Sequence, residues 1–318
     1  MSDLGHVLVL AGGLSYEREV SLRSGRRVSE VLRAAGIDVE TRDTDASLVP
    51  SVLADPPDAV FVTLHGGSGE DGAIRSVLEL LSVPYVGAAP DACRIAFDKP
   101  TAKTVVRSVG VRTPEAVVLP KETFHDLGAT AVLARIIDRL GLPLFVKPSR
   151  GGSALGASIV RKADELPAAM VGCFAYGDTA LVERYIEGVE VAVSVIDAGD
   201  GPAALPPVEI VADEGVYDYS ARYTAGHTEF FAPARLRPEV AEACAQMAIT
   251  AHTALGLRDL SRTDIIVDAS GQPYFLEVNV APGMTETSLL PMAAEAAGQD
   301  LSQICASLLR AAVRRAAA

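Results

Sequence analysis

Short apolar runs alternate with amphipathic stretches in the first third of the chain. The run from His6 to Leu10 is followed by two glycines, which is typical of a buried parallel strand that ends in a turn. Residues 28–35 then carry apolar side chains at helical spacing. The same alternation recurs over residues 59–64 and 74–81. The pattern predicts a small doubly wound parallel-sheet α/β domain over residues 1–98.

The middle of the chain combines a predicted strand with a glycine-rich loop. We expect a helix to begin near Lys99. Residues 141–148 predict a strand that carries Lys147 toward the glycine- and serine-rich loop that follows, and residues 180–183 predict a further strand. We interpret residues 99–186 as a second, central lobe.

The last third of the chain changes character twice. Strand-like alternation dominates residues 190–211, whereas residues 212–231 turn polar and tyrosine-rich, which predicts a mobile loop. Helical spacing returns near residues 240–255 and again over residues 301–312. We interpret residues 187–318 as a third, C-terminal lobe of mixed α and β structure.

Composition narrows the class of protein. The chain has 318 residues, of which 49% are hydrophobic, enough for several packed layers. Twenty-eight basic and 41 acidic side chains give a net charge of −13, and no lysine- or arginine-rich block is present, so we expect no nucleic-acid partner. Four widely spaced cysteines among apolar neighbours predict buried, reduced thiols. The chain also lacks a long apolar run and a basic leader, so we expect a cytoplasmic protein without membrane contact.

One motif suggests a dinucleotide but is rejected. Residues 67–72 match G-x-G-x-x-G after a predicted strand, and Asp91 follows about twenty residues later. However, Glu70 and Asp71 would put two carboxylates beside the pyrophosphate, where negative charge is least favourable. We interpret the segment as a tight strand-to-helix turn whose acidic residues favour the helix N-terminus, and not as part of a nicotinamide enzyme.

A predicted β-hairpin near the C-terminus gathers oxygen ligands. The apolar run after Asp264 and the run that ends at Asn279 flank a turn, so pairing of the two strands brings Asp264 near Glu277 and Asn279. Residues two apart share a strand face, so Glu277 and Asn279 point the same way. Carboxylate and amide oxygens without His or Cys suit Mg²⁺. The alternative interpretation is a solvated hairpin edge.

Two loops add groups that suit phosphate and oxyanion chemistry. The loop over residues 281–288 contains Gly283, which lets backbone N–H groups approach an oxyanion, and serine hydroxyls that can bind a carboxylate. Upstream, Lys147 and the amide-rich loop over residues 149–156 offer phosphate contacts, although the P-loop pattern is absent.

These pieces, in this order, resemble the ATP-grasp superfamily, and the similarity to the D-alanine–D-alanine ligase family extends over nearly the whole chain. Eight collinear blocks carry the resemblance: AGGLSYEREVSL, LHGGSGEDG, DKPTAK, VKPSRGGSALGAS, VERYIEGVEVAV, YDYSARY, SRTDIIV and EVNVAPGMTETSL. The resemblance implies an N-terminal α/β domain followed by a two-lobed ATP-grasp fold. It further implies ligation of two D-alanine molecules with ATP through an acyl phosphate, for peptidoglycan precursors, by a homodimer.

The resemblance also assigns roles to individual residues at the nucleotide. Its ATP-binding set is Lys99 and Lys147 at the phosphates, Glu183 at the adenine side, Glu190 at the ribose, and Arg184, Ile186 and Arg222. Its metal ligands are Asp264, Glu277 and Asn279, which would hold two Mg²⁺ ions that Mn²⁺ can replace.

A second set of roles concerns the amino acids. Glu17 would receive the ammonium of the first D-alanine and form a hydrogen-bonded trio with Ser153 and Tyr223. The remaining assigned residues are His65, Ser288 and Leu289 for substrate binding, and Arg262 and the N–H of Gly283 for the oxyanion. Each has a simpler alternative: Glu17 could support a helix start, His65 could be a strand-end histidine bonded to backbone, and Lys99 and Lys147 could be solvated.

The match departs from the family at a few positions. Arg222 stands where the family usually has lysine, and Gly151 and Ala154 stand where many relatives have polar side chains. By resemblance to the ordinary ligases of the family, Tyr223 implies a dipeptide product and not a depsipeptide. Two other functions stay open: a ligase of the same superfamily with a different amino or hydroxy acid acceptor, and a nucleotide-binding protein without turnover, against which the combined set of metal ligands and Arg262 argues.

Overall fold

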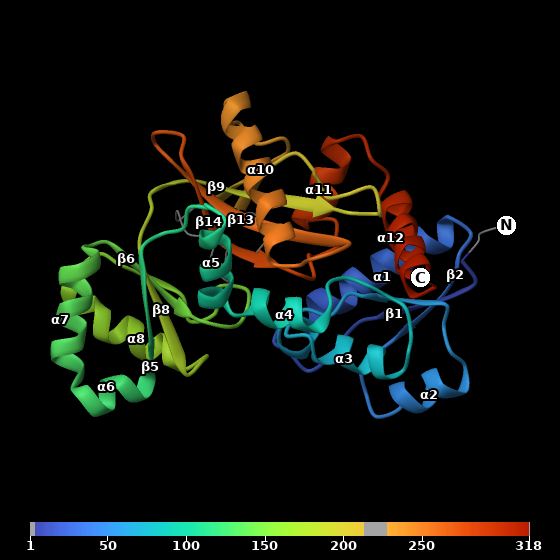
Figure 1. Cartoon of the computed structure of the whole chain (residues 1–318), viewed down its shortest axis with the longest axis horizontal. Helices are drawn as coiled ribbons and strands as arrows, with labels where there is room; N and C mark the ends of the chain where they lie inside the picture. Colours follow the sequence, from blue (N-terminus) through green and yellow to red (C-terminus); the bar gives the residue numbers. More distant parts are fainter. Residues whose placement is uncertain (1–3, 213–227, 318) are drawn as a thin grey trace.

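The computed structural model describes residues 4–212 and 228–317, which form three β-sheets flanked by helices (Figure 1). The first sheet lies at one end of the molecule, the second lies at the other end, and the third runs between them. The site described below lies where these three parts meet.

The first sheet is parallel and has the strand order β2-β1-β3-β4. Its strands are β1 (His6–Leu10), β2 (Asp38–Arg42), β3 (Ala59–Val62) and β4 (Tyr85–Val86). The helices of this part are α1 (Arg18–Ala34), α2 (Leu48–Ala54), α3 (Ala73–Leu80) and α4 (Pro90–Phe97), with the 3₁₀ turn η1 (Gly67–Gly69). The predicted alternation of strands and helices is confirmed.

The second sheet is antiparallel, with the strand order β5-β8-β6-β7. Its strands are β5 (Ala116–Pro120), β6 (Leu144–Pro148), β7 (Ser158–Val160) and β8 (Thr179–Arg184). The helices are α6 (Lys121–Leu127), α7 (Ala129–Leu140) and α8 (Leu166–Phe174), with the 3₁₀ turn η2 (Ala163–Glu165). The preceding helix α5 (Lys99–Ser108) packs instead on β14 (Pro273–Asn279) of the third sheet. Apolar residues of α7 and α8 pack on this sheet in one core cluster, so Lys147 is carried on a rigid strand.

The third sheet is antiparallel, with the order β12-β11-β9-β13-β14 and a short strand β10 paired with β9. Its strands are β9 (Gly188–Ile196), β10 (Ala203–Ala204), β11 (Val208–Ala212), β12 (Thr228–Phe231), β13 (Leu260–Asp268) and β14 (Pro273–Asn279). The helices are α10 (Pro238–Ala254), α11 (Leu289–Ala296) and α12 (Leu301–Ala316). Apolar residues of α11 and α12 share a core cluster with α1 and β1, so the chain ends packed against its own beginning.

The loop predicted over residues 212–231 is wrong at both ends. Ala212 closes β11 and pairs with Thr228, and the register continues to Glu209 opposite Phe231. The sequence pattern did not predict β12 because the strand contains polar residues. Only one face of an antiparallel edge strand needs to be apolar. Arg222 and Tyr223 lie outside the described residues.

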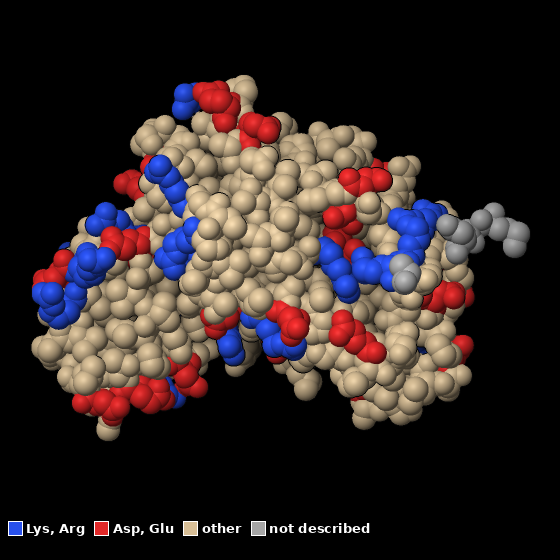
Figure 2. Space-filling view, in the orientation of Figure 1, with Lys and Arg blue, Asp and Glu red and all other residues tan. Residues whose placement is uncertain are grey.

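Charged side chains of both signs lie on the surface, whereas the cysteines lie in the interior. Figure 2 shows Lys and Arg interspersed with Asp and Glu on this face of the molecule. All four cysteines are buried free thiols, as predicted. Within residues 4–212 and 228–317, every helix is too short or too polar to span a bilayer.

Candidate active site

The hairpin of β13 and β14 brings the predicted oxygen ligands together. Asp264 lies opposite Glu277, and Arg262 lies opposite Asn279. The register shifts after Asp264, so Leu276 is an extra residue on β14, and both Leu276 and Glu277 line the same cavity. Asp264 is only 4% exposed, which excludes the solvated hairpin edge.

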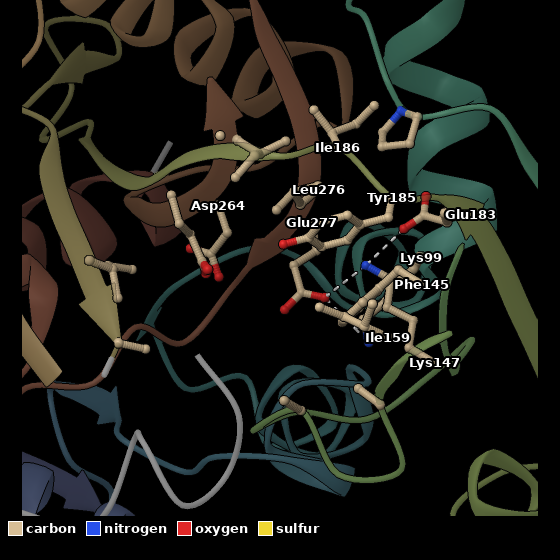
Figure 3. A pocket seen from close by; sticks show the side chains of 18 of the residues that line it. Lys99, Phe145, Lys147, Ile159, Glu183, Tyr185, Ile186, Asp264, Leu276 and Glu277 are labelled. Atoms are coloured by element: carbon tan, nitrogen blue, oxygen red, sulfur yellow. Dashed lines mark ion pairs between the residues drawn. The ribbon is translucent and has the colours of Figure 1, made fainter. Parts of the chain in front are cut away.

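A first cavity of about 410 Å³ opens between the second and third sheets. Apolar side chains on both sheets, among them Phe145, Ile159 and Ile266, form much of its wall. The predicted residues that line it are Lys99, Lys147, Glu183, Arg184, Ile186, Glu190, Asp264 and Glu277. Figure 3 shows Lys99, Lys147, Glu183 and Glu277 gathered at one end of the cavity, with Asp264 set apart from them. The shape therefore offers an apolar slot that leads to a charged end.

Two lysines at the charged end are held by acidic partners. Lys147 Nζ lies 3.1 Å from Glu183 Oε2 and 3.9 Å from Glu277 Oε2 (Figure 3). Lys99 Nζ lies 3.6 Å from Glu277 Oε2 and donates to the Gly151 carbonyl at 2.7 Å. Both lysines are buried, so the alternative of solvated surface charges is wrong.

Glu183 holds a second lysine that the sequence analysis did not single out. Its Oε1 lies 2.7 Å from Lys103 Nζ, and both residues are 1% exposed. Burial by itself raises the pKa of Glu183, but Lys103 and Lys147 hold that pKa below its usual value. Burial also opposes charge on Lys147, yet Glu183 and Glu277 leave its pKa raised. Glu183 is therefore a carboxylate between two cations.

A second cavity, of about 470 Å³, lies on the other side of Lys99. The predicted residues that line it are Glu17, His65, Lys99, Ser153, Arg262, Glu277, Asn279, Gly283, Ser288 and Leu289. Each predicted site residue within the described ranges thus lines one cavity or both. The two cavities share Lys99, Gly151, Gly152 and Glu277 as walls.

Glu17 occupies the N-cap position of α1, but its side chain makes no capping hydrogen bond. Its carboxylate instead accepts a hydrogen bond from Ser153 Oγ, which joins the first domain to the glycine-rich loop. A Cβ on Gly152 would lie 2.9 Å from Glu17 Oε2, and one on Gly66, whose φ is +64°, would also collide with that carboxylate. The positive φ favours glycine at position 66, whereas a side chain at position 152 would displace the Glu17 carboxylate.

His65 belongs to a buried hydrogen-bonded group. Its Nε2 lies 3.1 Å from Ser24 Oγ, and Ser24 Oγ accepts from the Met284 N–H at 3.1 Å. Burial lowers the pKa of His65, which favours the neutral imidazole. Ser24 thereby ties α1 and His65 to the loop that precedes α11.

Arg262 and Asp264 are two apart on β13 and form a bidentate ion pair, with distances of 2.7 and 2.9 Å. Ser288 precedes α11, and its Oγ accepts from the Thr285 N–H at 3.0 Å. A Cβ on Gly283 would lie 2.6 Å from Ser288 Oγ. The positive N-terminal end of α11, at Leu289, thus opens beside a hydroxyl and suits a carboxylate.

The rejected glycine motif has a structural explanation. Gly72 has a φ of +91° before α3, and Asp71 Oδ1 accepts from the Ala73 N–H at 2.8 Å, so the predicted strand-to-helix turn is present. Glu70 behaves differently, because it is buried in the wall of the second cavity. Burial, and then repulsion by Glu17, raises the pKa of Glu70 to about 7.

Three residues of the site were missed: Lys103, Ser24 and Glu70. A signal existed for Lys103, because it lies four residues after Lys99 on one helix and so faces the same side. Glu70 was noticed only as an obstacle to a dinucleotide. Ser24 carries no signal, since a serine within a helix is common.

The oxygen ligands fit a magnesium ion. Among the described residues no group of three or more His, Cys, Asp or Glu is placed for a metal. Asp264 and Glu277 supply two carboxylates, and Asn279 adds an amide oxygen that accepts from the Ala281 N–H at 2.8 Å. One or two carboxylates are what Mg²⁺ uses when substrate phosphates complete its coordination.

Comparison with known proteins gives a consistent result. Residues 105–310 match the family described as D-ala D-ala ligase C-terminus, and residues 40–88 match D-ala D-ala ligase N-terminus. The D-alanine–D-alanine ligase of Bordetella avium is 40% identical over 96% of this chain and 94% of its own.

Solved structures agree over the same length. The D-alanine–D-alanine ligase from Bacillus anthracis in complex with ATP superposes with a TM-score of 0.81 at 29% identity, over 98% of this chain and 99% of that one. The VanG D-Ala:D-Ser ligase from Enterococcus faecalis superposes with a TM-score of 0.83 at 28% identity, over 98% and 100%.

Proposed function

This chain belongs to the D-alanine–D-alanine ligase family, and we propose that it joins two D-alanine molecules, with conversion of ATP to ADP and phosphate, to supply a peptidoglycan precursor. The observation that carries this proposal is the shared wall of the two cavities. Lys99, Gly151, Gly152 and Glu277 line both, so a phosphoryl group held there reaches a carboxylate in the second cavity.

The chemistry requires such a boundary because a carboxylate is a poor electrophile. A carboxylate oxygen of the first D-alanine attacks the γ-phosphorus, and ADP leaves. The amine of the second D-alanine then attacks the acyl carbon, inorganic phosphate leaves, and a proton is released as the amide forms. Closure of the site against water protects the acyl phosphate from hydrolysis.

The first cavity supplies the nucleotide side in this proposal. Lys99 and Lys147 bind the phosphates and stabilise charge on the transferred group. The apolar slot receives the adenine beside Glu183, Arg184 and Ile186, with Glu190 at the ribose. Arg222 is assigned to ATP by the family resemblance alone.

The second cavity supplies the amino-acid side. Glu17, held by Ser153, receives the ammonium of the first D-alanine, next to the neutral His65. Ser288 and the N-terminus of α11 at Leu289 bind the carboxylate of the second D-alanine. Arg262 and the N–H of Gly283 stabilise the oxyanion. Tyr223 as third member of the trio with Glu17 and Ser153 rests on the resemblance.

The metal assignment follows the donor set. Asp264, Glu277 and Asn279 would hold two Mg²⁺ ions, which Mn²⁺ can replace. Bound there, Mg²⁺ supplies positive charge to the phosphates of ATP. The ion pair with Arg262 fixes the direction of the Asp264 carboxylate.

Three further features are proposed with this function. Domain boundaries near residues 98/99 and 186/187 are supported by the three separate sheets. A homodimer is supported by the family resemblance and is tested by light scattering of the eluted protein. Action in the cytoplasm is supported by the need for ATP.

The acceptor is the part of the proposal most open to test, because one similar structure is a D-Ala:D-Ser ligase. We would measure phosphate release with ATP and Mg²⁺ across D-alanine, D-serine, D-lactate and L-alanine, and identify products by mass. D-alanyl-D-alanine is the expected main product. Phosphate release that D-alanine fails to stimulate would remove the proposal, and stimulation only with a second acceptor would replace the product.

A further inference from the structure

Lys103 is a buried lysine that lines neither cavity itself but contacts Glu183 in the wall of the first. It lies on α5 one turn after Lys99, and its side chain is 1% exposed. It is absent from the lining of both cavities. A buried ammonium without a partner is strongly unfavourable, so its contacts explain its presence.

Those contacts link the central and C-terminal parts of the site. Lys103 Nζ lies 2.7 Å from Glu183 Oε1 on β8, and it donates to the Phe275 carbonyl on β14 at 3.2 Å. Its distance to the centre of the Phe275 ring is 5.9 Å. Phe275 lies two residues before Glu277. Lys103 therefore joins the strand that holds Glu183 to the strand that carries Glu277.

The other oxygen of Glu183 faces Lys147. Oε2 lies 3.1 Å from Lys147 Nζ, which in turn lies 3.9 Å from Glu277 (Figure 3). With Lys103 present, the charge of Glu183 is shared between two cations. Without it, Oε1 would be buried and unpaired, and the carboxylate would turn or draw Lys147 closer. Either change moves Lys147 Nζ away from its place between two carboxylates.

We propose that Lys103 is a positioning residue for nucleotide binding: through Glu183 it sets the place of Lys147. The proposal deepens the ligase function and rests on it only for the identity of the bound nucleotide. Lys103 itself touches no substrate in this account.

The test measures the affinity for Mg-ADP by calorimetry, without an amino acid. Lys103→Met keeps the apolar stem and removes the charge, and we expect affinity to fall about 10- to 100-fold, the effect of taking one of two cationic partners from a buried carboxylate. Lys121→Met is the matched control, because Lys121 is half-exposed and pairs with Asp178 away from both cavities. It should bind Mg-ADP within about twofold of the parent. A folded Lys103→Met protein with parental affinity would overturn the proposal.

A double-mutant cycle separates positioning from mere stability. Lys147→Met should weaken Mg-ADP binding, and adding Lys103→Met to it should change affinity by less than about threefold, because the group to be positioned is gone. Full multiplication of the two losses would show that Lys103 acts independently of Lys147 and would refute the proposal.

Lys103→Met leaves a buried carboxylate with one partner and so risks misfolding. For that case we would compare Glu183→Gln with the double variant Lys103→Met/Glu183→Gln. The double variant removes both charges of the ion pair. These two proteins should bind Mg-ADP within about threefold of each other, since Lys103 acts through Glu183. A double variant at least tenfold weaker than Glu183→Gln would contradict this route.

The test of Lys103 by Mg-ADP binding can succeed or fail independently of the test of the ligase function by product formation. If the parent protein makes no D-alanyl-D-alanine, the proposed function fails, while Mg-ADP binding still decides the role of Lys103. In turnover, the kcat/KM for ATP should fall in Lys103→Met while the KM for D-alanine stays within about threefold. A merely structural role would not divide the two substrates in this way.

Discussion

The two cavities solve different binding problems with different parts of the fold. The first is built from strands of two sheets, and its charged side chains are paired, as Lys147 is with Glu183. The second is built largely from loops and helix ends, and it places two carboxylates, Glu17 and Glu70, near each other. A polyanion needs fixed cations, whereas a small zwitterion needs hydrogen bonds of defined direction.

The difference also appears in the backbone. Lys147 and Glu183 lie on neighbouring antiparallel strands of a packed sheet. Ser153, which binds Glu17 and lines the second cavity, has a φ of +53°. Non-glycine residues adopt this left-handed conformation at some energetic cost. The amino-acid side therefore depends on strained loop geometry, and the nucleotide side depends on charge pairing.

The largest effect is expected from changing Glu277, one of the four residues that line both cavities. Glu277→Gln keeps the shape of the side chain and removes its charge, so both lysines lose a partner, as would the proposed Mg²⁺. We expect kcat to fall about 10³-fold or more, which corresponds to about 4 kcal/mol. Initial rates of ADP formation across a Mg²⁺ titration measure this.

The fold should survive that change, because the Glu277 side chain is 25% exposed. Thermal unfolding should therefore shift by only a few degrees. Glu295→Gln, at an exposed position of α11, is the control and should keep parental kcat. Wild-type turnover in Glu277→Gln would refute the metal assignment.

The change of folding stability with pH should have opposite signs for a carboxyl group of the second cavity, Glu70, and one of the first, Glu183. The folded pKa of Glu70 is about 7, against a usual value of 4.5, so the folded state binds a proton more tightly. Stability is therefore highest below pH 4.5 with respect to this group and falls as pH rises to about 7, by about 3 kcal/mol. Glu70→Gln should remove this fall, as urea unfolding at pH 5, 6, 7 and 8 would measure.

Glu183 should behave in the opposite way. Its folded pKa is lowered by Lys103 and Lys147, so its contribution to stability is present above the usual carboxyl pKa and is lost as pH falls through the lowered one. Glu183→Gln should therefore destabilise the protein at pH 7.

The Glu70 prediction has its own contradicting outcome. If the stability of Glu70→Gln changed with pH in the same way as that of the parent, Glu70 would stay ionised in the folded protein.

Local patterns predicted the nucleotide side better than the amino-acid side. The hairpin of β13 and β14 follows from strand alternation, so Asp264 could be placed near Glu277 and Asn279 from the sequence. Lys147 could be placed at a strand end for the same reason. These relations depend on neighbours along one strand or one turn.

Contacts between distant segments could not be predicted in this way. Lys103 and Glu183 are 80 positions apart, and Ser24 and Met284 are 260 apart. The bulge at Leu276 and strand β12 depend on pairing that periodicity does not specify. Without the resemblance to a family, the residues of the second cavity would have remained separate side chains.

The smallest expected effect tests the loop geometry of the amino-acid side. Ser153→Ala removes the hydroxyl that donates to Glu17 while the backbone stays the same. A hydrogen bond to a charged group contributes about 1.5–3 kcal/mol, so kcat/KM for D-alanine should fall about 10- to 100-fold. The KM for ATP should stay within about twofold, because Ser153 lines only the second cavity.

Ser270→Ala is the matched control for that change. Ser270 Oγ also donates to a carboxylate, that of Asp268 at 2.6 Å, but it lies in the exposed turn between β13 and β14. Solvent replaces such a bond, so kinetics with both substrates should stay parental. If Ser153→Ala instead raised the KM for ATP as much as that for D-alanine, the glycine-rich loop would serve both cavities equally. The division of the site into a charge-paired nucleotide side and a loop-built amino-acid side would then fail.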